Sequence, residues 1–491
     1  MRFLLITLIL LSNLSANSNT EDNEENKAIV KQKIKCNLTI KYTQLPDEVD
    51  SLKEFLKGGV FYGRLRLNSF LFNPKSIGEN HFAMGAGGSL IYKSAILQGF
   101  SFTSGIYTSQ NIWHKDISPS KYRSSKDTFS RYNLATENSY NLTSMAQNYV
   151  EYKKGSNSLK LGHFLIESTL LKSNDTKMIP NSFEGAYAKI GAIPKTKIQL
   201  AYITRQKLRD HESFHHVLAY GDNPNDTYSK WSENDDGGMH RGLTLSKLQK
   251  NGINDRLIML DIKNRGIKRT TLRLGFTAVP DLISSLSLEG TYNFKIDRKF
   301  KIKPSIRYVK QFDEGAGAIG GANLRNNTTG YTDPNSLSAS LIAGRVDIIK
   351  GAGSLRLGYS KTADEGDFLT PWRGFATAGY TRAMGQTNWY ANTETFLIRA
   401  DYDFSKAHLV SGLRVMMRYA KEDFDDNKPA VSSDVNVLTV DVIKRFKNHP
   451  NFITKLRTAF VNEQHPVLNH DGSYKKDPSY NEIRLEMNYL F

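Results

Sequence analysis

The chain has 491 residues, a single cysteine and a formal net charge of +17. One cysteine, Cys36, cannot form an intrachain disulfide, which excludes a small scaffold held together by such bonds. The positive charge is spread along the whole chain and no nucleic-acid-binding motif accompanies it, so we expect no nucleic-acid partner.

The first residues are typical of an export signal. Met1 and Arg2 form a short charged start, residues 3–11 are apolar, and Ala16-Asn17-Ser18 offers a small-x-small cleavage site. The apolar run is too short to span a bilayer core about 30 Å thick. We therefore predict a secretory signal peptide over residues 1–18, with a single membrane anchor as the alternative. No later run approaches the roughly 18 apolar residues that a transmembrane helix needs.

Residues 19–57 differ in composition from the rest of the chain. Residues 21–26 are acidic and polar, which is typical of a disordered segment. Pro46 followed by two acids indicates the start of a helix, and Gly58 indicates its end. We predict a periplasmic N-terminal segment that contains one short helix.

From Phe61 onward the chain alternates apolar and polar residues in segments of about ten residues. In the first segment Arg64 and Arg66 share one face, while Phe61 and Leu65 share the other. Successive side chains of a strand point to opposite sides, so each segment is predicted to be a strand with one apolar face. About 18 such segments follow one another, within the range of bacterial outer-membrane barrels.

The connections between these segments alternate in length. Tight turns are expected at 93–95, 155–157, 193–195, 264–266, 350–352, 404–406 and 448–450. Between them lie mostly long connections, such as 110–146, 206–254, 312–335, 362–392 and 462–479. Short periplasmic turns that alternate with long extracellular loops are typical of an outer-membrane barrel.

These patterns predict an all-β fold, a transmembrane antiparallel β-barrel of about 18 strands over residues 58–491. The mean hydropathy of −0.47 fits this fold, because a barrel with a wet lumen needs only an apolar outer face. A soluble sandwich has no reason to alternate its loop lengths, and a propeller or solenoid would show a fixed sequence period.

Three stretches carry a family resemblance. Residues 51–58, followed by Gly63-Arg64-Leu65-Arg66, are similar to a family's entry into its first strand. Residues 173–185 (SNDTKMIPNSFEG) match its pattern SND-x-[RK]-x-x-P-x-[TS]-F-x-G. The terminal Tyr489-Leu490-Phe491 resembles the assembly signal of many outer-membrane barrels. The chain thus resembles the OprD-type porins, the substrate-specific outer-membrane carboxylate channels, and especially their epsilonproteobacterial members.

The resemblance implies a monomeric barrel with a constricted, basic lumen for small solutes, often carboxylates. It also implies that the segment 165–180 folds inward as a constriction loop, where Ser173, Asn174, Asp175 and Lys177 would offer donors and acceptors to a solute. An ordinary surface loop is the alternative. Residues 370–375 are only similar to the Trp- and Gly-rich loop of the family, so no substrate preference is transferred.

The polar faces of the predicted strands carry many cations. A Lys or Arg that faces lipid at the bilayer midplane costs roughly 2–4 kcal/mol, so these side chains must point into the lumen or lie near the rims. A ladder of cations favours anions, and Arg binds carboxylates in a bidentate manner. The candidate solute-binding cations are Arg64, Arg66, Lys301, Lys303, Arg307, Arg356, Arg399, Arg414, Arg418, Lys455 and Arg457, with Arg484 on a similar face.

The alternative for these cations is a place at the rim or neutralisation by lumen acids. The acids available for that are Asp261, Glu289, Asp347, Asp401 and Glu486.

Residues 211–215 read His-Glu-Ser-Phe-His, the H-E-x-x-H pattern of zinc proteases, and Glu233 is spaced like a third ligand. That chemistry needs both histidines on one face of a stable helix. This stretch instead follows a predicted strand and lies in a long polar loop, so we predict a plain extracellular loop. Adventitious metal binding and an outer-membrane protease are the alternatives. The Gly-rich residues 315–321 lack the strand–helix context of a dinucleotide site.

The sequence therefore predicts an outer-membrane porin that passes small, anionic solutes by passive diffusion. No catalysis, cofactor or metal is expected. The expected partners are outer-membrane lipid, small solutes and the barrel-assembly machinery, and the resemblance favours a monomer. The alternative function is a surface-exposed barrel whose long loops act mainly as an adhesin.

Overall fold

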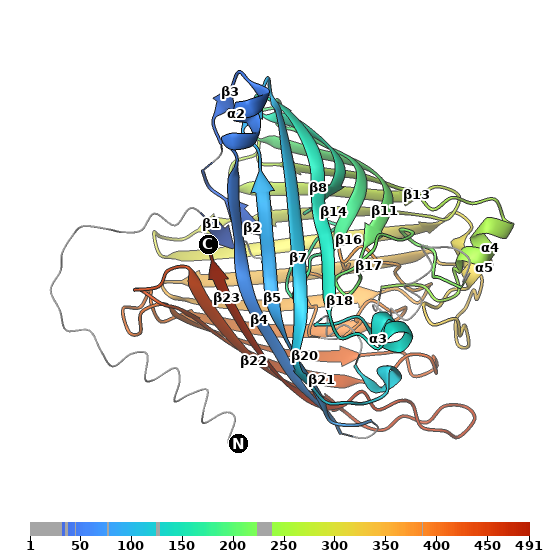
Figure 1. Cartoon of the computed structure of the whole chain (residues 1–491). Coiled ribbons are helices and arrows are strands. Elements are labelled where there is room, and N and C mark those ends of the chain that lie inside the picture. Colours follow the sequence, from blue (N-terminus) through green and yellow to red (C-terminus); the bar gives the residue numbers. More distant parts are fainter. Residues whose placement is uncertain are drawn as a thin grey trace. The chain divides into compact units, whose positions relative to one another are not determined.

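The computed structural model describes residues 32–34, 38–44, 46–75, 78–123, 128–222, 238–384 and 386–491. The predicted signal peptide and the acidic stretch after it lie outside these residues. Within the described part of the chain, eighteen long strands close into a single antiparallel barrel (Figure 1). The predicted fold class is thereby confirmed.

The barrel strands follow one another around the wall in chain order. They are β4 (Val60–Pro74), β5 (His81–Lys93), β7 (Phe100–His114), β8 (Leu142–Lys154), β9 (Asn157–Phe164), β10 (Ser182–Ile190), β11 (Thr196–Lys207), β12 (Leu257–Asn264), β13 (Thr270–Val279), β14 (Ile283–Tyr292), β16 (Phe300–Asp313), β17 (Ala339–Lys350), β18 (Gly353–Thr362), β19 (Glu394–Asp403), β20 (Leu413–Asp423), β21 (Val435–Arg445), β22 (Phe452–Glu463) and β23 (Tyr480–Leu490). The last strand pairs with the first, with Met487 opposite Leu67. Closure leaves no strand edge unpaired. This matters because unpaired backbone N–H and C=O groups are costly in lipid.

Several short elements accompany the barrel. They are the hairpin β1 (Gln32–Ile34) and β2 (Ile40–Tyr42), the strands β3 (Glu48–Val49), β6 (Ile96–Leu97) and β15 (Phe294–Lys295), the helices α2 (Leu52–Lys57), α3 (Arg131–Glu137), α4 (Leu245–Lys250) and α5 (Ala316–Gly320), and the 3-10 turn η1 (Pro119–Lys121). Over the described residues, none of the helices is long and apolar enough to span a membrane.

The helix before the barrel starts later than its sequence predicts. Ser51 caps α2, its hydroxyl accepting a hydrogen bond from the Glu54 backbone N–H at 3.2 Å. The acids after Pro46 do not open the helix, because Glu48 and Val49 form β3 and pair in parallel with β6. A serine cap that satisfies a free backbone N–H is the stronger start signal here.

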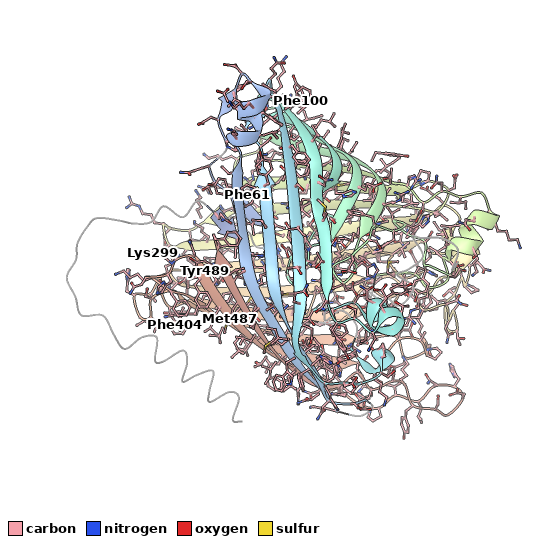
Figure 2. The ribbon with its side chains drawn as sticks, viewed as in Figure 1. Phe61, Phe100, Lys299, Phe404, Met487 and Tyr489 are labelled. Carbon is pink, nitrogen blue, oxygen red and sulfur yellow. The ribbon has the colours of Figure 1, made fainter. Side chains whose placement is uncertain are left out.

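The two faces of the barrel wall match the predicted alternation. Leu65 is 60% exposed on the outer face, whereas its neighbours Arg64 and Arg66 are 0% and 5% exposed inside. Figure 2 labels Phe61 and Tyr489 among the side chains at the end of the barrel that holds the short turns. At this end, outward aromatic rings pack in pairs, such as Phe61–Tyr92 at 5.0 Å and Phe100–Tyr152 at 4.8 Å between centroids. Such pairs fit a membrane-interface girdle.

The loop lengths agree with the prediction in most places. The long connections include 115–141, 165–181, 208–256, 314–338, 363–393 and 464–479. Two connections on the same side, 75–80 and 280–282, are short.

One of the short turns is longer than predicted. The connection 404–412 replaces the tight turn expected at 404–406. Its chain bends at His408 (φ 60°) and at Gly412 (φ 67°), where a Cβ atom would lie 1.9 Å from the Arg445 carbonyl oxygen. This close approach requires glycine.

Candidate functional site

The loop 165–181 crosses the inside of the barrel. At one end, the Asp175 carboxylate forms a salt bridge with Arg66 of β4 at 2.7 Å. At the other end, the backbone N–H and the hydroxyl of Thr169 both donate to Asp261 of β12 at 2.6 Å. Because β4 and β12 lie on different parts of the wall, these contacts hold the loop within the lumen. This inward fold is the one that the family resemblance implied.

The four polar residues predicted for this loop take different positions. Ser173, Asp175 and Lys177 are buried, at 0%, 1% and 3% exposure, and only Asn174 is partly open. The Ser173 hydroxyl accepts a hydrogen bond from the Ile166 backbone N–H at 2.9 Å, and Asp175 binds two arginines. In this structure these groups brace the loop, and their contact with a solute remains a prediction.

A second loop, 363–393, also folds into the lumen, and sequence reasoning missed it. The Arg307 guanidinium donates to the carbonyl oxygens of Ala376 and Ala378 at 3.0 and 2.9 Å. Arg356 donates to the Gly379 carbonyl oxygen at 2.7 Å. The signal that was available is composition, because this loop holds many aromatic residues, buried in the structure: Phe368, Trp372, Phe375, Tyr380, Trp389 and Tyr390.

The two inward loops contact each other. The Lys172 backbone N–H donates to the Trp372 carbonyl oxygen at 2.9 Å, and Leu171 forms a β-bridge with Arg373. The Trp372 indole N–H in turn donates to the Val217 carbonyl oxygen of the 208–256 loop at 2.9 Å. The loops therefore form one packed constriction.

The N-terminal hairpin β1–β2 narrows the lumen from the other end. The Arg64 guanidinium donates to the Leu38 carbonyl oxygen at 2.7 Å, and the rings of Tyr42 and Tyr62 stack at 5.1 Å. Tyr42 also packs against the cluster that contains Met178 of the constriction loop. Since Arg64 and Tyr62 lie on the inner face of β4, the hairpin occupies space inside the barrel mouth.

The strand cations chosen from the sequence all lie on the inner face, and most of them are paired with acids. Arg307 pairs with Glu289 at 2.6 Å, Arg356 with Asp347 at 2.6 Å, Arg399 and Arg414 with Asp401 at 2.6 and 2.7 Å, Arg418 with Asp441 at 3.7 Å, Lys455 with Glu486 at 3.5 Å, and Arg457 donates to Asp441 at 2.6 Å. Arg64, Arg66 and Arg484 are also paired, with Asp175 and Glu482. Neutralisation by lumen acids, the alternative for these cations, thus applies to most of them.

Three of these paired arginines form a ladder of guanidinium groups on one wall of the barrel. Arg356, Arg399 and Arg418 lie directly opposite one another on β18, β19 and β20. Lys303 and Arg345 line a lumen cavity of about 360 Å³ together with Arg356 and Arg399. This cavity offers several cationic donors within reach of one small anion.

The His-Glu-Ser-Phe-His stretch lacks the geometry of a zinc protease. Residues 211–215 form turns and a β-bridge residue, with no helix among them. The Glu212 carboxylate accepts hydrogen bonds from the Asn133 side chain and the Thr143 backbone N–H, at 2.8 and 2.6 Å. Glu233 lies outside the described residues. Within those residues, no group of three His, Cys, Asp or Glu side chains is placed to hold a metal ion.

A closed antiparallel barrel with an apolar outer face and a charged lumen narrowed by inward loops is the architecture of a porin. The family model of the outer membrane porins of the OprD family matches residues 133–489, more than half of the chain. The chain therefore belongs to the OprD family, and it is located in the bacterial outer membrane. No curated protein matches the chain.

Solved structures show the same fold. The chain is similar to Pseudomonas aeruginosa OpdK with vanillate (14% identity, TM-score 0.64) and to Pseudomonas aeruginosa OccK2 (OpdF) in complex with glucuronate (14%, 0.63); each match covers 89% of this chain and 99% of the other. Acinetobacter baumannii OccAB3 is similar at 17% identity and a TM-score of 0.62, over 88% of this chain and 99% of that protein.

Proposed function

We propose that this porin is a passive diffusion channel for small anionic solutes of the carboxylate type. The observation that carries the proposal is the ladder of Arg356, Arg399 and Arg418 beside the inward loops. Guanidinium groups bind carboxylates through paired hydrogen bonds, and a narrow lumen brings a solute close to them. Vanillate and glucuronate, named with OpdK and OccK2, are both carboxylates, which supports this substrate class.

The proposed site comprises the inward cations and the polar residues of the constriction loop. Acid partners such as Asp401 and Asp441 hold the guanidinium planes in place and keep the fixed charge low. A solute carboxylate would exchange with these acids for the same donors, which allows binding and release in turn.

The test is the reversal potential of single channels in a planar bilayer under a salt gradient. We expect discrete current steps with anion preference, and we expect Arg399→Gln to reduce that preference. Cation preference would overturn the anionic substrate class. A folded barrel with no current steps would overturn the channel function and favour the adhesin.

We also propose six properties that accompany this function. Residues 1–18 are removed as a signal peptide, residues 19–57 form a periplasmic segment, and the Tyr489-Leu490-Phe491 terminus is read by the barrel-assembly machinery. The barrel works as a monomer, is of the epsilonproteobacterial type and carries no catalytic activity. Cross-linking of the native membrane tests the monomeric state directly, because a trimer would appear as a discrete larger band.

A further inference from the structure

Three cations that the sequence reasoning did not select form a row on the inner wall. Lys197 of β11 lies directly opposite Lys263 of β12, and Lys263 lies directly opposite Arg273 of β13. They share the inner face with Asp261, which binds Thr169 of the constriction loop. The row therefore faces the lumen at the base of that loop.

This row differs from the guanidinium ladder because its charges are not balanced. In the part of the chain that the structure describes, none of the three cations makes an ion pair. Two acids, Glu167 and Asp261, line the space beside the row against six cations. Glu289, which lies opposite Arg273, pairs with Arg307 at 2.6 Å. This wall therefore carries a surplus of positive charge, to which the three cations of the row contribute.

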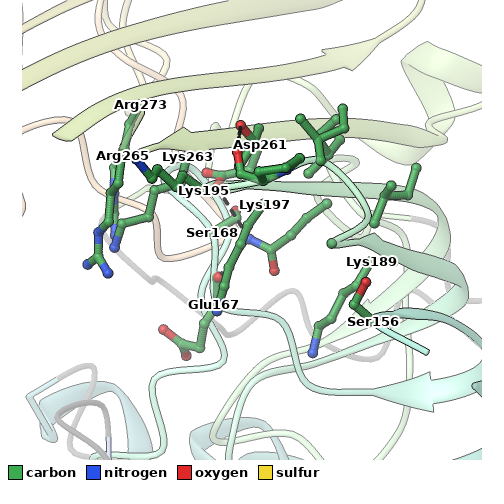
Figure 3. Close-up of a pocket in the computed structure, with 17 residues that line it drawn as sticks. Ser156, Glu167, Ser168, Lys189, Lys195, Lys197, Asp261, Lys263, Arg265 and Arg273 are labelled. Atoms are coloured by element: carbon green, nitrogen blue, oxygen red, sulfur yellow. Dashed lines mark hydrogen bonds between the residues drawn. The ribbon is translucent and has the colours of Figure 1, made fainter. Parts of the chain in front are cut away.

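The row borders a cavity of about 770 Å³ that is large enough for a small solute. Figure 3 shows Arg265 and Arg273 at one side of this space and Lys189 at the other. Ser168 and Gln199 add polar groups to its lining. All three cations of the row are accessible, with Lys197 the most exposed.

Like charges in directly opposite positions destabilise a sheet, because their Cβ atoms are only about 5 Å apart. Three in succession over neighbouring strands, spaced about 5 Å each, are stabilised when an anion binds between them. A molecule with one negative charge can neutralise one of them, whereas a molecule with two can contact neighbouring cations together.

We propose that the row Lys197–Lys263–Arg273 and its cavity are a binding site for small organic dianions, in particular dicarboxylates. This inference rests on the proposed function and adds a substrate class to it. The row offers a second site with free donors, at which a dianion gains more than a monoanion of equal size. The row therefore favours doubly charged solutes over singly charged ones.

The experiment compares succinate and butyrate, which share a four-carbon skeleton but carry two charges and one. Each is titrated as a blocker of single-channel chloride current through the full chain in planar bilayers. We expect the double variant Lys263→Gln/Arg273→Gln to weaken the succinate block about tenfold and the butyrate block much less. Lys263→Arg/Arg273→Lys, which keeps both charges, should retain the succinate block.

The matched control is Lys299→Gln/Lys447→Gln, which removes two charges from exposed periplasmic turns outside the cavity. Its succinate block should equal that of the wild type. An unchanged succinate block in the cavity variant, with wild-type anion preference intact, would overturn this inference alone. A wild-type channel without anion preference would overturn the proposed function itself.

Discussion

At the scale of the residue, the lumen is organised by carboxylates that each serve several donors. Asp175 is the most consequential, because it is 1% exposed and binds Arg64 and Arg66 of β4 from a loop more than a hundred positions away in the chain. One buried carboxylate between two buried guanidinium groups both neutralises them and anchors the constriction loop. Its removal leaves two charges without a partner inside the wall.

The variant Asp175→Asn tests this role. We expect it to lower the free energy of unfolding by about 3–5 kcal/mol, because breaking a buried pair leaves the opposite charge uncompensated. Urea unfolding of the barrel in lipid vesicles, followed by tryptophan fluorescence, measures this loss. Asp471→Asn, on an exposed outer loop, is the control and should change little. A stability equal to that of the wild type would contradict the anchoring role.

Asp367 has the same kind of role among the outer loops. Its carboxylate accepts hydrogen bonds from the backbone N–H groups of Leu324 and Ala391 at 3.0 and 2.9 Å and from the Tyr331 hydroxyl at 2.7 Å. Burial raises the pKa of Asp367 from 3.8 to about 6, and these hydrogen bonds offset only part of that effect. Asp367 is therefore protonated at a higher pH in the packed loops than an exposed aspartate is.

The loops 314–338 and 363–393 should pack more firmly in mild acid. A raised pKa in the packed state means that the stabilising contribution is complete below about pH 4 and is lost as the pH rises through about 6. Between pH 7.5 and pH 5 we expect a gain of about 1 kcal/mol in the local opening free energy. Hydrogen exchange of the Leu324 and Ala391 amides measures it. Asp367→Asn should abolish the pH dependence, and an unaltered dependence in that variant would refute the assignment.

At the scale of the element, the hairpin β1–β2 is the unexpected part of the pore. It comes from the segment predicted to be periplasmic, yet Leu38 and Tyr42 contact the inner face of β4. The Arg64 guanidinium joins this hairpin to Asp175 of the constriction loop. The narrow region is therefore built from the N-terminal hairpin as well as from the two inward loops.

Loosening the hairpin should widen the channel. In the double variant Ile40→Asp/Tyr42→Ala, the apolar contact with the cluster around Met178 is lost, and we expect a larger single-channel conductance in planar bilayers. Lys41→Ala is the matched control, because the Lys41 side chain is exposed on the same strand. If the double variant conducts like the wild type, the hairpin does not narrow the pore.

At the scale of the whole molecule, the barrel separates two electrostatic regions. The wall of β18–β20 holds paired guanidinium groups, whereas the wall of β11–β13 holds the unpaired row of Lys197, Lys263 and Arg273. With a formal net charge of +17, the chain presents a field that attracts anions before any of them touches a side chain. Such a field is screened by salt, whereas close contacts are screened less.

The anion preference should therefore fall as salt increases. From about 0.1 M to about 1 M potassium chloride the Debye length shortens from about 10 Å to about 3 Å, so the long-range part of the attraction is lost. Reversal potentials at a constant salt ratio measure the effect. In Lys263→Gln/Arg273→Gln the preference should depend less on salt. A preference that is independent of salt in the wild type would show that close contacts alone select the ion.

The sequence by itself determined the strands, their number of about 18 and the alternation of an apolar with a polar face, because side chains alternate with a period of two residues. It also determined the likeness to the OprD family. Only the tertiary structure decided which side chains and segments meet. It paired Asp175 with Arg66, turned the 363–393 loop inward and aligned the row from Lys197 to Arg273. These depend on register across strands and on contacts between segments far apart in the chain. Local periodicity contains no information about them, since a shift of register changes every neighbour while leaving each strand's own pattern intact.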